Sequence, residues 1–238
     1  MDLDDILGSP AGASTVKVTK NFEGKDFVDM LYRFFREERE DHQREDGVFW
    51  VTDLVACSAK IQFSRKYPEL ELAKLFDPVL VQGTLVHYGV EWLLGKMLAE
   101  EGYEVKSEVE GSVEIKLRNY FTRVPLEEVV VKGRADLLAF KDNERIGVEV
   151  KTARADLSLP HEHHVDQARI YNTIFSLDAT YIVYVTPDRI AQFVVDNRMG
   201  LQDIARRIVE QSTPRYDWEC QYCPFSILCP YKVTKQKK

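Results

Sequence analysis

One candidate hairpin constrains the fold of this chain more than any other stretch of its sequence. Within residues 132–152, two apolar runs flank Asp-Asn at 142–143, a dipeptide suited to a two-residue turn. If the turn forms there, the register of the hairpin places Asp136 directly across from Glu149. The sequence therefore predicts two antiparallel strands that bring a pair of carboxylates together.

The side chains of this hairpin sort into an apolar face and a charged face. Because successive side chains along a strand alternate, Val148 and Val150 point one way while Glu149 and Lys151 point the other. With Asp136 opposite, two carboxylates and one ammonium share a face. Paired carboxylates suit Mg²⁺ or Mn²⁺, and such a metal site suits phosphodiester hydrolysis.

The same face has a second interpretation. Exposed strand faces often carry Asp, Glu and Lys as solvated cross-strand pairs of little energetic weight. Spacing alone does not choose between this arrangement and a metal site.

Length and charge limit the possible organisation. The chain of 238 residues is long enough to bury one substantial core, and we expect a single domain over residues 1–238. A net charge of −7 argues against a generally basic nucleic-acid binder, so any contact with nucleic acid is expected to be local. The start lacks the basic and apolar segments of a signal peptide, and no apolar run approaches a membrane span. We expect a cytoplasmic protein without membrane contact.

Hydrophobic periodicity predicts a mixture of helices and strands. Residues 1–25 are expected to be loosely ordered, and residues 103–117 to form a strand or a hairpin broken at Glu110 and Gly111. The remaining expected helices cover residues 27–43, 58–67, 83–101, 165–175 and 201–211, and the remaining strands cover 180–185 and 190–195. This order favours an α/β fold with a mixed sheet flanked by helices.

Histidines occur in two settings. His87 shares a helix face with Glu91, and a lone histidine on a largely apolar helix is usually a core residue. His161, His163 and His164 lack the i, i+4 spacing of a helical zinc site. We expect those three to form a polar loop before a helix, near the substrate.

The cysteines form a further constellation. Cys220, Cys223 and Cys229 lie in one short segment, whereas Cys57 stands far upstream. Four cysteines in a cytoplasmic protein favour a metal centre over disulfides. A centre with these ligands would join the two chain ends, and four thiolates suit zinc or an iron–sulfur cluster equally well.

Four short motifs, taken in order, resemble those of the RecB-like branch of the PD-(D/E)XK nucleases. They are Gly83-Thr-Leu-Val-His87, Gly133-Arg-Ala-Asp136, Gly147-Val-Glu-Val-Lys-Thr152 and Gln167-Ala-Arg-Ile-Tyr171. The resemblance implies a restriction-endonuclease-like fold and a nuclease core at about residues 77–212.

The resemblance also implies roles for individual residues. Metal ligands would be the side chains of His87, Asp136 and Glu149 and the backbone carbonyl of Val150. Lys151 would be a catalytic residue together with Asp136 and Glu149, and it would orient or help deprotonate the attacking water. Gln167 and Tyr171, spaced i, i+4 on one helix face, would lie near the metal and the substrate backbone.

One cysteine before such a core and three after it resemble the stand-alone CRISPR-associated iron–sulfur exonucleases. That resemblance covers roughly residues 50–232. It implies an iron–sulfur lobe that is built from about residues 48–76 and 213–238. Cys57, Cys220, Cys223 and Cys229 would hold a cluster, [4Fe–4S] in preference to [2Fe–2S]. The chain departs from the family's usual Cys-Pro-Arg, since residues 57–60 read Cys-Ser-Ala-Lys.

The implied function is metal-dependent DNA cleavage that serves the processing of spacer precursors in CRISPR adaptation. Cleavage is expected mainly 5′-to-3′ on single-stranded DNA, with endonuclease activity in addition, and the CRISPR integrase proteins are the expected partners. Two alternatives stay open: a stand-alone repair or recombination nuclease, and a non-catalytic zinc-stabilised module that binds nucleic acid.

Overall fold

The computed structural model describes residues 25–40, 45–72, 77–124 and 126–234. The loosely ordered segment expected over residues 1–25 falls almost wholly outside this part of the chain. The expected helix at residues 27–43 is observed as α1, Phe27–Glu40. Its predicted last residues, 41–43, also lie outside the described part of the chain.

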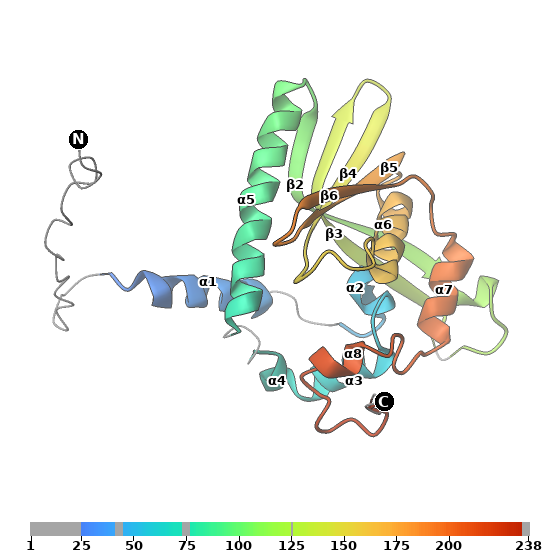
Figure 1. Ribbon diagram of the computed structural model, residues 1–238. Coiled ribbons are helices and arrows are strands. Elements are labelled where there is room, and N and C mark those ends of the chain that lie inside the picture. Colours follow the sequence, from blue (N-terminus) through green and yellow to red (C-terminus); the bar gives the residue numbers. More distant parts are fainter. Residues whose placement is uncertain (1–24, 41–44, 73–76, 125, 235–238) are drawn as a thin grey trace, which may run out of the picture.

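A six-stranded mixed sheet forms the centre of the fold (Figure 1). The strands run in the order β1-β3-β4-β5-β6, with β2 paired to β3 as well. Two neighbouring pairs, β1 with β3 and β4 with β5, are parallel, and the others are antiparallel. The strands are β1 Val48–Trp50, β2 Glu104–Lys116, β3 Glu128–Lys141, β4 Glu144–Thr152, β5 Ala179–Val185 and β6 Ile190–Val195. The expected mixed α/β sheet is thus confirmed.

Helices lie on both faces of this sheet. Besides α1 they are α2 Val51–Leu54, α3 Ser58–Lys66, α4 Pro68–Leu72, α5 Pro78–Glu100, α6 Glu162–Ile174, α7 Leu201–Val209 and α8 Glu219–Tyr222, with a 3₁₀ turn at Leu117–Asn119. On β5, Val183 packs with the side chains of α5, whereas Ile182 and Tyr184 pack with those of α6. Since neighbouring side chains on a strand point to opposite faces, α5 and α6 cover opposite faces of the sheet.

The largest apolar cluster lies where α2, α6 and α7 meet the β1–β2–β3 end of the sheet. It contains fully buried side chains from the three helices, β2 and β3, among them Val51, Ile115, Val131, Ile170 and Ile204, and β1 adds the partly buried Phe49. Tyr171 of α6 lies in the same cluster. The core therefore fixes one end of α6, the helix that also carries Gln167.

Two helices begin earlier than the periodicity predicts. The longest, α5, starts at Pro78 because the Asp77 side chain accepts the Val79 N–H and proline suits the first helical position. The other, α6, starts at Glu162, so His163 and His164 lie in its first turn. The expectation that these two histidines belong to a loop is therefore wrong.

Strand β2 is one continuous element, not a hairpin broken at Glu110 and Gly111. Both residues pair in register with β3, and Gly111 leaves room for Phe175, whose ring would lie 2.3 Å from an added Cβ. A glycine in a strand therefore marks a close approach here and not a break. The irregular residue is Glu108, which takes a left-handed φ of 51° between the paired residues Ser107 and Val109.

The predicted hairpin forms with the expected turn. Lys141 pairs with Glu144, and Asp142 takes a left-handed φ of 52°. The ladder runs inward only as far as Leu137 opposite Val148. Pairing thus stops one step before the two carboxylates.

The two ends of the chain contact each other directly. The Ser58 N–H donates to the Ser212 carbonyl at 3.0 Å, and the Ser212 N–H donates to Ser58 Oγ at 2.7 Å. Phe63 stacks on the fully buried Phe225 with ring centroids 5.8 Å apart. Polypeptide contacts alone therefore bring the segment after α2 beside the C-terminal segment.

We predict that Gly133→Ala destabilises the fold by about 1–3 kcal/mol, the usual cost of overpacking. An added Cβ there would lie 2.7 Å from Tyr171 Cε1 and 3.0 Å from Val51 Cγ2. Gly89→Ala is the matched control, because a Cβ at this position in α5 meets nothing within 4 Å. It should stabilise the protein by about 0.5–1 kcal/mol through helix propensity. Denaturant unfolding of both variants measures the difference, and equal stabilities would contradict the packing argument.

Candidate active site

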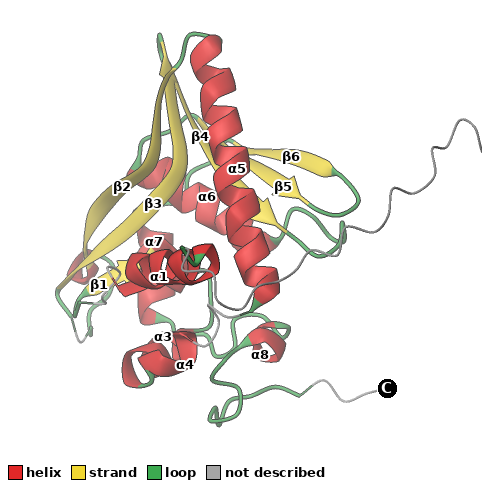
Figure 2. Ribbon diagram, turned by 90° about the vertical axis from the view of Figure 1, so that its left-hand side faces the viewer, coloured by secondary structure: helices red, strands yellow, loops and turns green. Residues whose placement is uncertain are grey.

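The site lies where β3 and β4 separate beyond their last pair. Figure 2 shows β2 and β3 diverging from β4, β5 and β6. In the gap, the Asp136 Oδ2 atom accepts a hydrogen bond from the Val150 N–H at 2.7 Å. A side-chain acceptor thus replaces the ladder at the point where Glu149 was expected directly opposite Asp136. The carboxylates meet in a gap between strands and not on a flat face.

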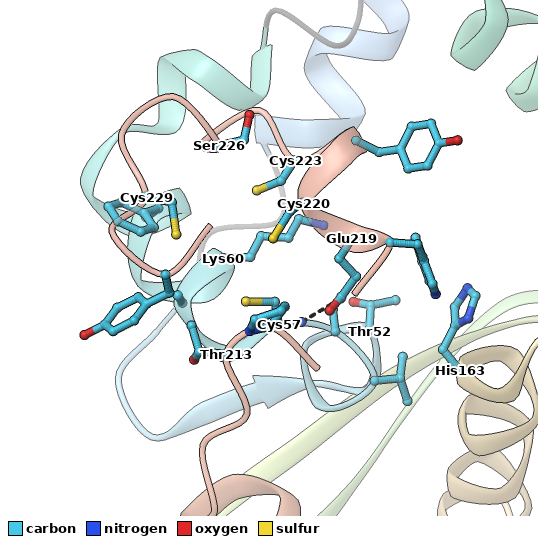
Figure 3. A pocket seen from close by; sticks show the side chains of 18 of the residues that line it. Thr52, Cys57, Lys60, His163, Thr213, Glu219, Cys220, Cys223, Ser226 and Cys229 are labelled. Atoms are coloured by element: carbon cyan, nitrogen blue, oxygen red, sulfur yellow. Dashed lines mark hydrogen bonds between the residues drawn. The ribbon is translucent and has the colours of Figure 1, made fainter. Parts of the chain in front are cut away.

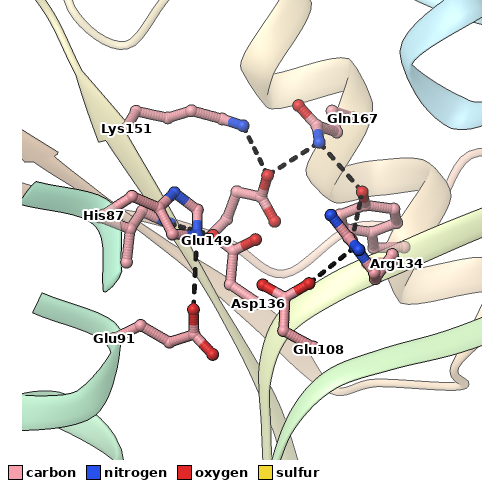
Figure 4. A network of polar contacts seen from close by, with 10 residues as sticks. His87, Glu91, Glu108, Arg134, Asp136, Glu149, Lys151 and Gln167 are labelled. Carbon is pink, nitrogen blue, oxygen red and sulfur yellow. Dashed lines mark hydrogen bonds and ion pairs between the residues drawn. The ribbon is translucent and has the colours of Figure 1, made fainter. Parts of the chain in front are cut away.

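Glu149 is the most enclosed of these carboxylates. Glu149 is 2% exposed and Asp136 7%, so the solvated-pair interpretation is wrong. Glu149 Oε1 accepts hydrogen bonds from Lys151 Nζ at 2.5 Å and from Gln167 Nε2 at 2.8 Å (Figure 4). Glu149 Oε2 is buried with no hydrogen-bond partner. One oxygen is therefore held in place while the other is left for a ligand.

Helix α6 supports Glu149 from behind. Gln167 donates to both Glu149 and the Tyr171 hydroxyl, and that hydroxyl donates to the Arg134 carbonyl at 2.8 Å. Gln167 and Tyr171 are both buried. These contacts hold Glu149 in place, and a place for the pair near the metal and the substrate backbone stays a prediction of the resemblance.

His87 reaches the site from α5. Its Nε2 atom lies 3.4 Å from Asp136 Oδ2 and 3.5 Å from Glu91 Oε2. The same helix packs Leu94 and Leu98 against the sheet, which fixes the face that His87 presents. The imidazole therefore faces carboxylates, and the core-residue interpretation does not hold.

The concentration of negative charge shifts several pKa values. Burial, with Asp136 next, raises the pKa of Glu149 in spite of the nearby Lys151. Burial would lower the pKa of Lys151, but Glu149 and Asp136 outweigh it and raise that pKa. Burial, followed by Glu108 and Asp136, raises the pKa of Glu91 to about 7. More carboxylates converge here than the local cations neutralise.

Three residues of this network (Figure 4), Glu91, Glu108 and Arg134, were not assigned from the sequence. Glu91 follows His87 by one helical turn, a spacing that could have identified it. Glu108 approaches from β2, and its Oε2 atom accepts from Arg134 Nε at 2.7 Å. No sequence signal marked Glu108, because a glutamate in the left-handed region is uncommon.

The four cysteines line one cavity of about 330 Å³. All four lie in the described part of the chain, and none forms a disulfide. Figure 3 shows their sulfur atoms directed toward a shared space. Burial raises the pKa of the Cys57 thiol, and Glu219 and Cys223 raise it further. Four thiols that converge on one cavity fit a cationic centre that would hold them as thiolates.

The same cavity extends toward the carboxylates. Lys151, Gln167, His163 and His164 line it together with the cysteines. His164 Nδ1 lies 2.7 Å from the Tyr184 hydroxyl. Burial, with His161 next, lowers the pKa of His163 to about 4, so this ring is neutral at neutral pH.

Comparison with known proteins decides the family. A CRISPR-associated exonuclease Cas4 from Saccharolobus solfataricus is 35% identical over 212 residues, which cover 87% of this chain and 99% of the relative. The chain belongs to the Cas4 family. The solved structure of SSO0001 is also similar, with a TM-score of 0.77 and 33% identity over 88% of this chain and 99% of that one. No family model matches the chain.

The alignment with the Cas4 relative takes in nearly the whole length of that protein. The similar structure confirms the sheet and its flanking helices as the family's fold. Within the described residues of this Cas4 family member, no helix has both the length and the apolar character needed to cross a membrane.

Proposed function

We propose that the chain is a metal-dependent deoxyribonuclease that acts mainly 5′-to-3′ on single-stranded DNA and also as an endonuclease. The observation that carries the proposal is the buried pair of Asp136 and Glu149 beside the Lys151 ammonium. Membership of a family of exonucleases supports the same conclusion. In this proposal the substrate lies in the cavity that Lys151 and Gln167 line.

The residues present fit a divalent metal ion. Side chains of His87, Asp136 and Glu149 and the Val150 carbonyl would hold it, and the unpartnered Glu149 Oε2 supports this assignment. Bound Mg²⁺ or Mn²⁺ lowers the pKa of water and stabilises charge on phosphate, and an imidazole ligand favours Mn²⁺. Gln167 keeps Glu149 oriented, and Lys151 supplies a positive charge for the phosphate or for the attacking water.

A row of aromatic rings supports the preference for single strands. Trp218 stacks on Tyr216 with centroids 5.9 Å apart and lies 5.0 Å from the ring of His163. Trp218 is 39% exposed and Tyr222 62%. His163, Trp218 and Tyr222 line the cavity that also reaches Lys151. Unpaired bases bind proteins by stacking on such rings, whereas bases within a duplex are already stacked.

For the cysteine centre we propose an iron–sulfur cluster, [4Fe–4S] in preference to [2Fe–2S]. Four thiolates on one zinc ion lie about 3.8 Å apart, given Zn–S bonds of about 2.3 Å. Across the described residues, no three of these sulfur atoms lie within 4.8 Å of one another. The wider spacing favours a cluster. Hydrolysis needs no electron transfer, so the cluster's role is to hold the lobe of residues 48–76 and 213–238 beside the nuclease core of residues 77–212.

The biological setting we propose is CRISPR adaptation, with spacer precursors as substrates, the integrase proteins as partners and the cytoplasm as location. Its support is the CRISPR association of the similar exonuclease. A stand-alone repair nuclease would have the same site, and the genes next to this one would distinguish the two settings. A non-catalytic zinc module would bind DNA without cleaving it in Mn²⁺.

Asp136→Asn and Glu149→Gln should each lower the rate of cleavage of labelled single-stranded DNA in Mn²⁺ by more than about 100-fold. This loss is larger than the roughly 10–100-fold expected when a residue that only supports a metal ligand is replaced. Asparagine keeps an acceptor for the Val150 N–H, so the melting temperature should change little. Gln167→Leu should cost about 10–100-fold, as expected of a positioning residue. Asp142→Asn, an exposed change in the same hairpin, is the control. Parental rates in Asp136→Asn would reject the assignment.

Cys57→Ala should remove the brown colour of anaerobically purified protein and lower its melting temperature about as much as Cys223→Ala. The centre closes a loop of more than 160 residues, which is worth on the order of 5 kcal/mol in the loop-closure model. Because Ser58 and Ser212 hold the ends together independently, the sheet should remain folded by circular dichroism. A Cys57→Ala protein with full colour would contradict a four-cysteine cluster.

Trp218→Ala should weaken binding of single-stranded DNA by about 1–3 kcal/mol, or roughly 5- to 150-fold, the usual worth of one stacked base. Trp92→Ala is the matched control, because Trp92 is 66% exposed on α5 and does not line the cavity. Fluorescence anisotropy with single-stranded and duplex probes measures the effect. Equal losses for both probes would contradict base stacking.

A further inference from the structure

Glu91 is a buried carboxylate that the proposed metal site leaves unexplained. It is 6% exposed, although it lies on a helix whose other side chains are at least partly exposed. Its Oε2 atom is buried, has no hydrogen-bond partner and lies 3.5 Å from His87 Nε2. A buried carboxylate oxygen without a donor is costly unless a ligand compensates it.

Glu108 approaches the same point from the sheet. Ser107 pairs with Leu137 and Val109 with Ala135, so the register places Glu108 opposite Asp136. Ligand atoms of His87, Glu91 and Glu108 all lie within 4.8 Å of one another. Arg134 binds one oxygen of Glu108 and so fixes its side chain at the cluster (Figure 4).

The position of Glu91 distinguishes a ligand from an orienting group. A carboxylate that orients a metal-binding histidine accepts from the ring nitrogen that faces away from the metal. Glu91 instead approaches Nε2, the same nitrogen that faces Asp136. Glu91 therefore lies on the ligand side of the imidazole.

The geometry points to a second divalent cation, Mg²⁺ or Mn²⁺, held by Glu91 and Glu108 beside His87 and next to the ion of the proposed nuclease site. Hard carboxylate oxygens suit these ions. In two-metal nucleases one ion activates the attacking water while the other stabilises the leaving oxygen. The catalytic use of this ion rests on the proposed function, but its binding does not.

Manganese content after equilibrium dialysis tests this inference without any activity assay. Wild-type protein should bind two Mn²⁺ per chain at its carboxylate sites. Glu91→Gln combined with Glu108→Gln should bind one, and the Mn²⁺-induced rise in melting temperature should become smaller. Glu100→Gln on α5 and Glu114→Gln on β2 are matched controls, because both carboxylates are exposed on the same two elements and neither belongs to the cluster. Both controls should bind two ions.

Glu149→Gln separates this inference from the proposed nuclease site. Loss of one ion in Glu149→Gln and of a different one in the Glu91 and Glu108 double variant supports two sites. If wild type binds a single ion that Glu149→Gln removes and the double variant retains, the second site is overturned while the nuclease site stands. If the double variant binds two ions, a proton shared by Glu91 and Glu108 accounts for their approach, and the inference is wrong.

Discussion

The hydrogen bond from the Val150 N–H to the Asp136 carboxylate determines the geometry of the site. It provides the N–H with an acceptor inside the protein at the point where the β3–β4 ladder ends, so the strands can separate without leaving a buried donor unsatisfied. The gap between them admits Glu149 and His87 from different elements. A continuous ladder would instead have kept the strands paired through this point.

The remaining structure holds the walls of that gap in place. On one face α5 packs Leu94 and Leu98 on the sheet and presents His87, and on the other α6 presents Gln167 from a core anchored by Tyr171. The two chain ends meet beside α6, where the cysteine cavity continues to Lys151. A change around the cysteines would therefore alter the cavity next to Lys151 and leave the carboxylates in place.

Local sequence signals allowed the central hairpin and several residues of the candidate site to be predicted. Turn chemistry and alternation located the hairpin, and the motifs that carry the family resemblance located His87 and Gln167, all of which the structure brings together. The end of the ladder at Leu137 was not predictable, because it depends on a side chain that competes with backbone pairing. Glu108 was missed because its backbone takes a conformation that its residue type rarely adopts. The Asp77–Pro78 start of α5, by contrast, was readable as a helix cap.

The charge of the site bears on how an acidic protein would act on DNA. Glu91, Glu108, Asp136 and Glu149 converge, while Lys151 and Arg134 are the cations paired with them. A phosphate approaching these carboxylates without a metal ion would meet net repulsion. Bound divalent cations would make the local charge positive. They would bind where the carboxylates are gathered, so the change would be confined to this site. Metal binding would thus determine both the chemistry and the place of substrate binding, and the net charge of −7 over the whole chain would not prevent either.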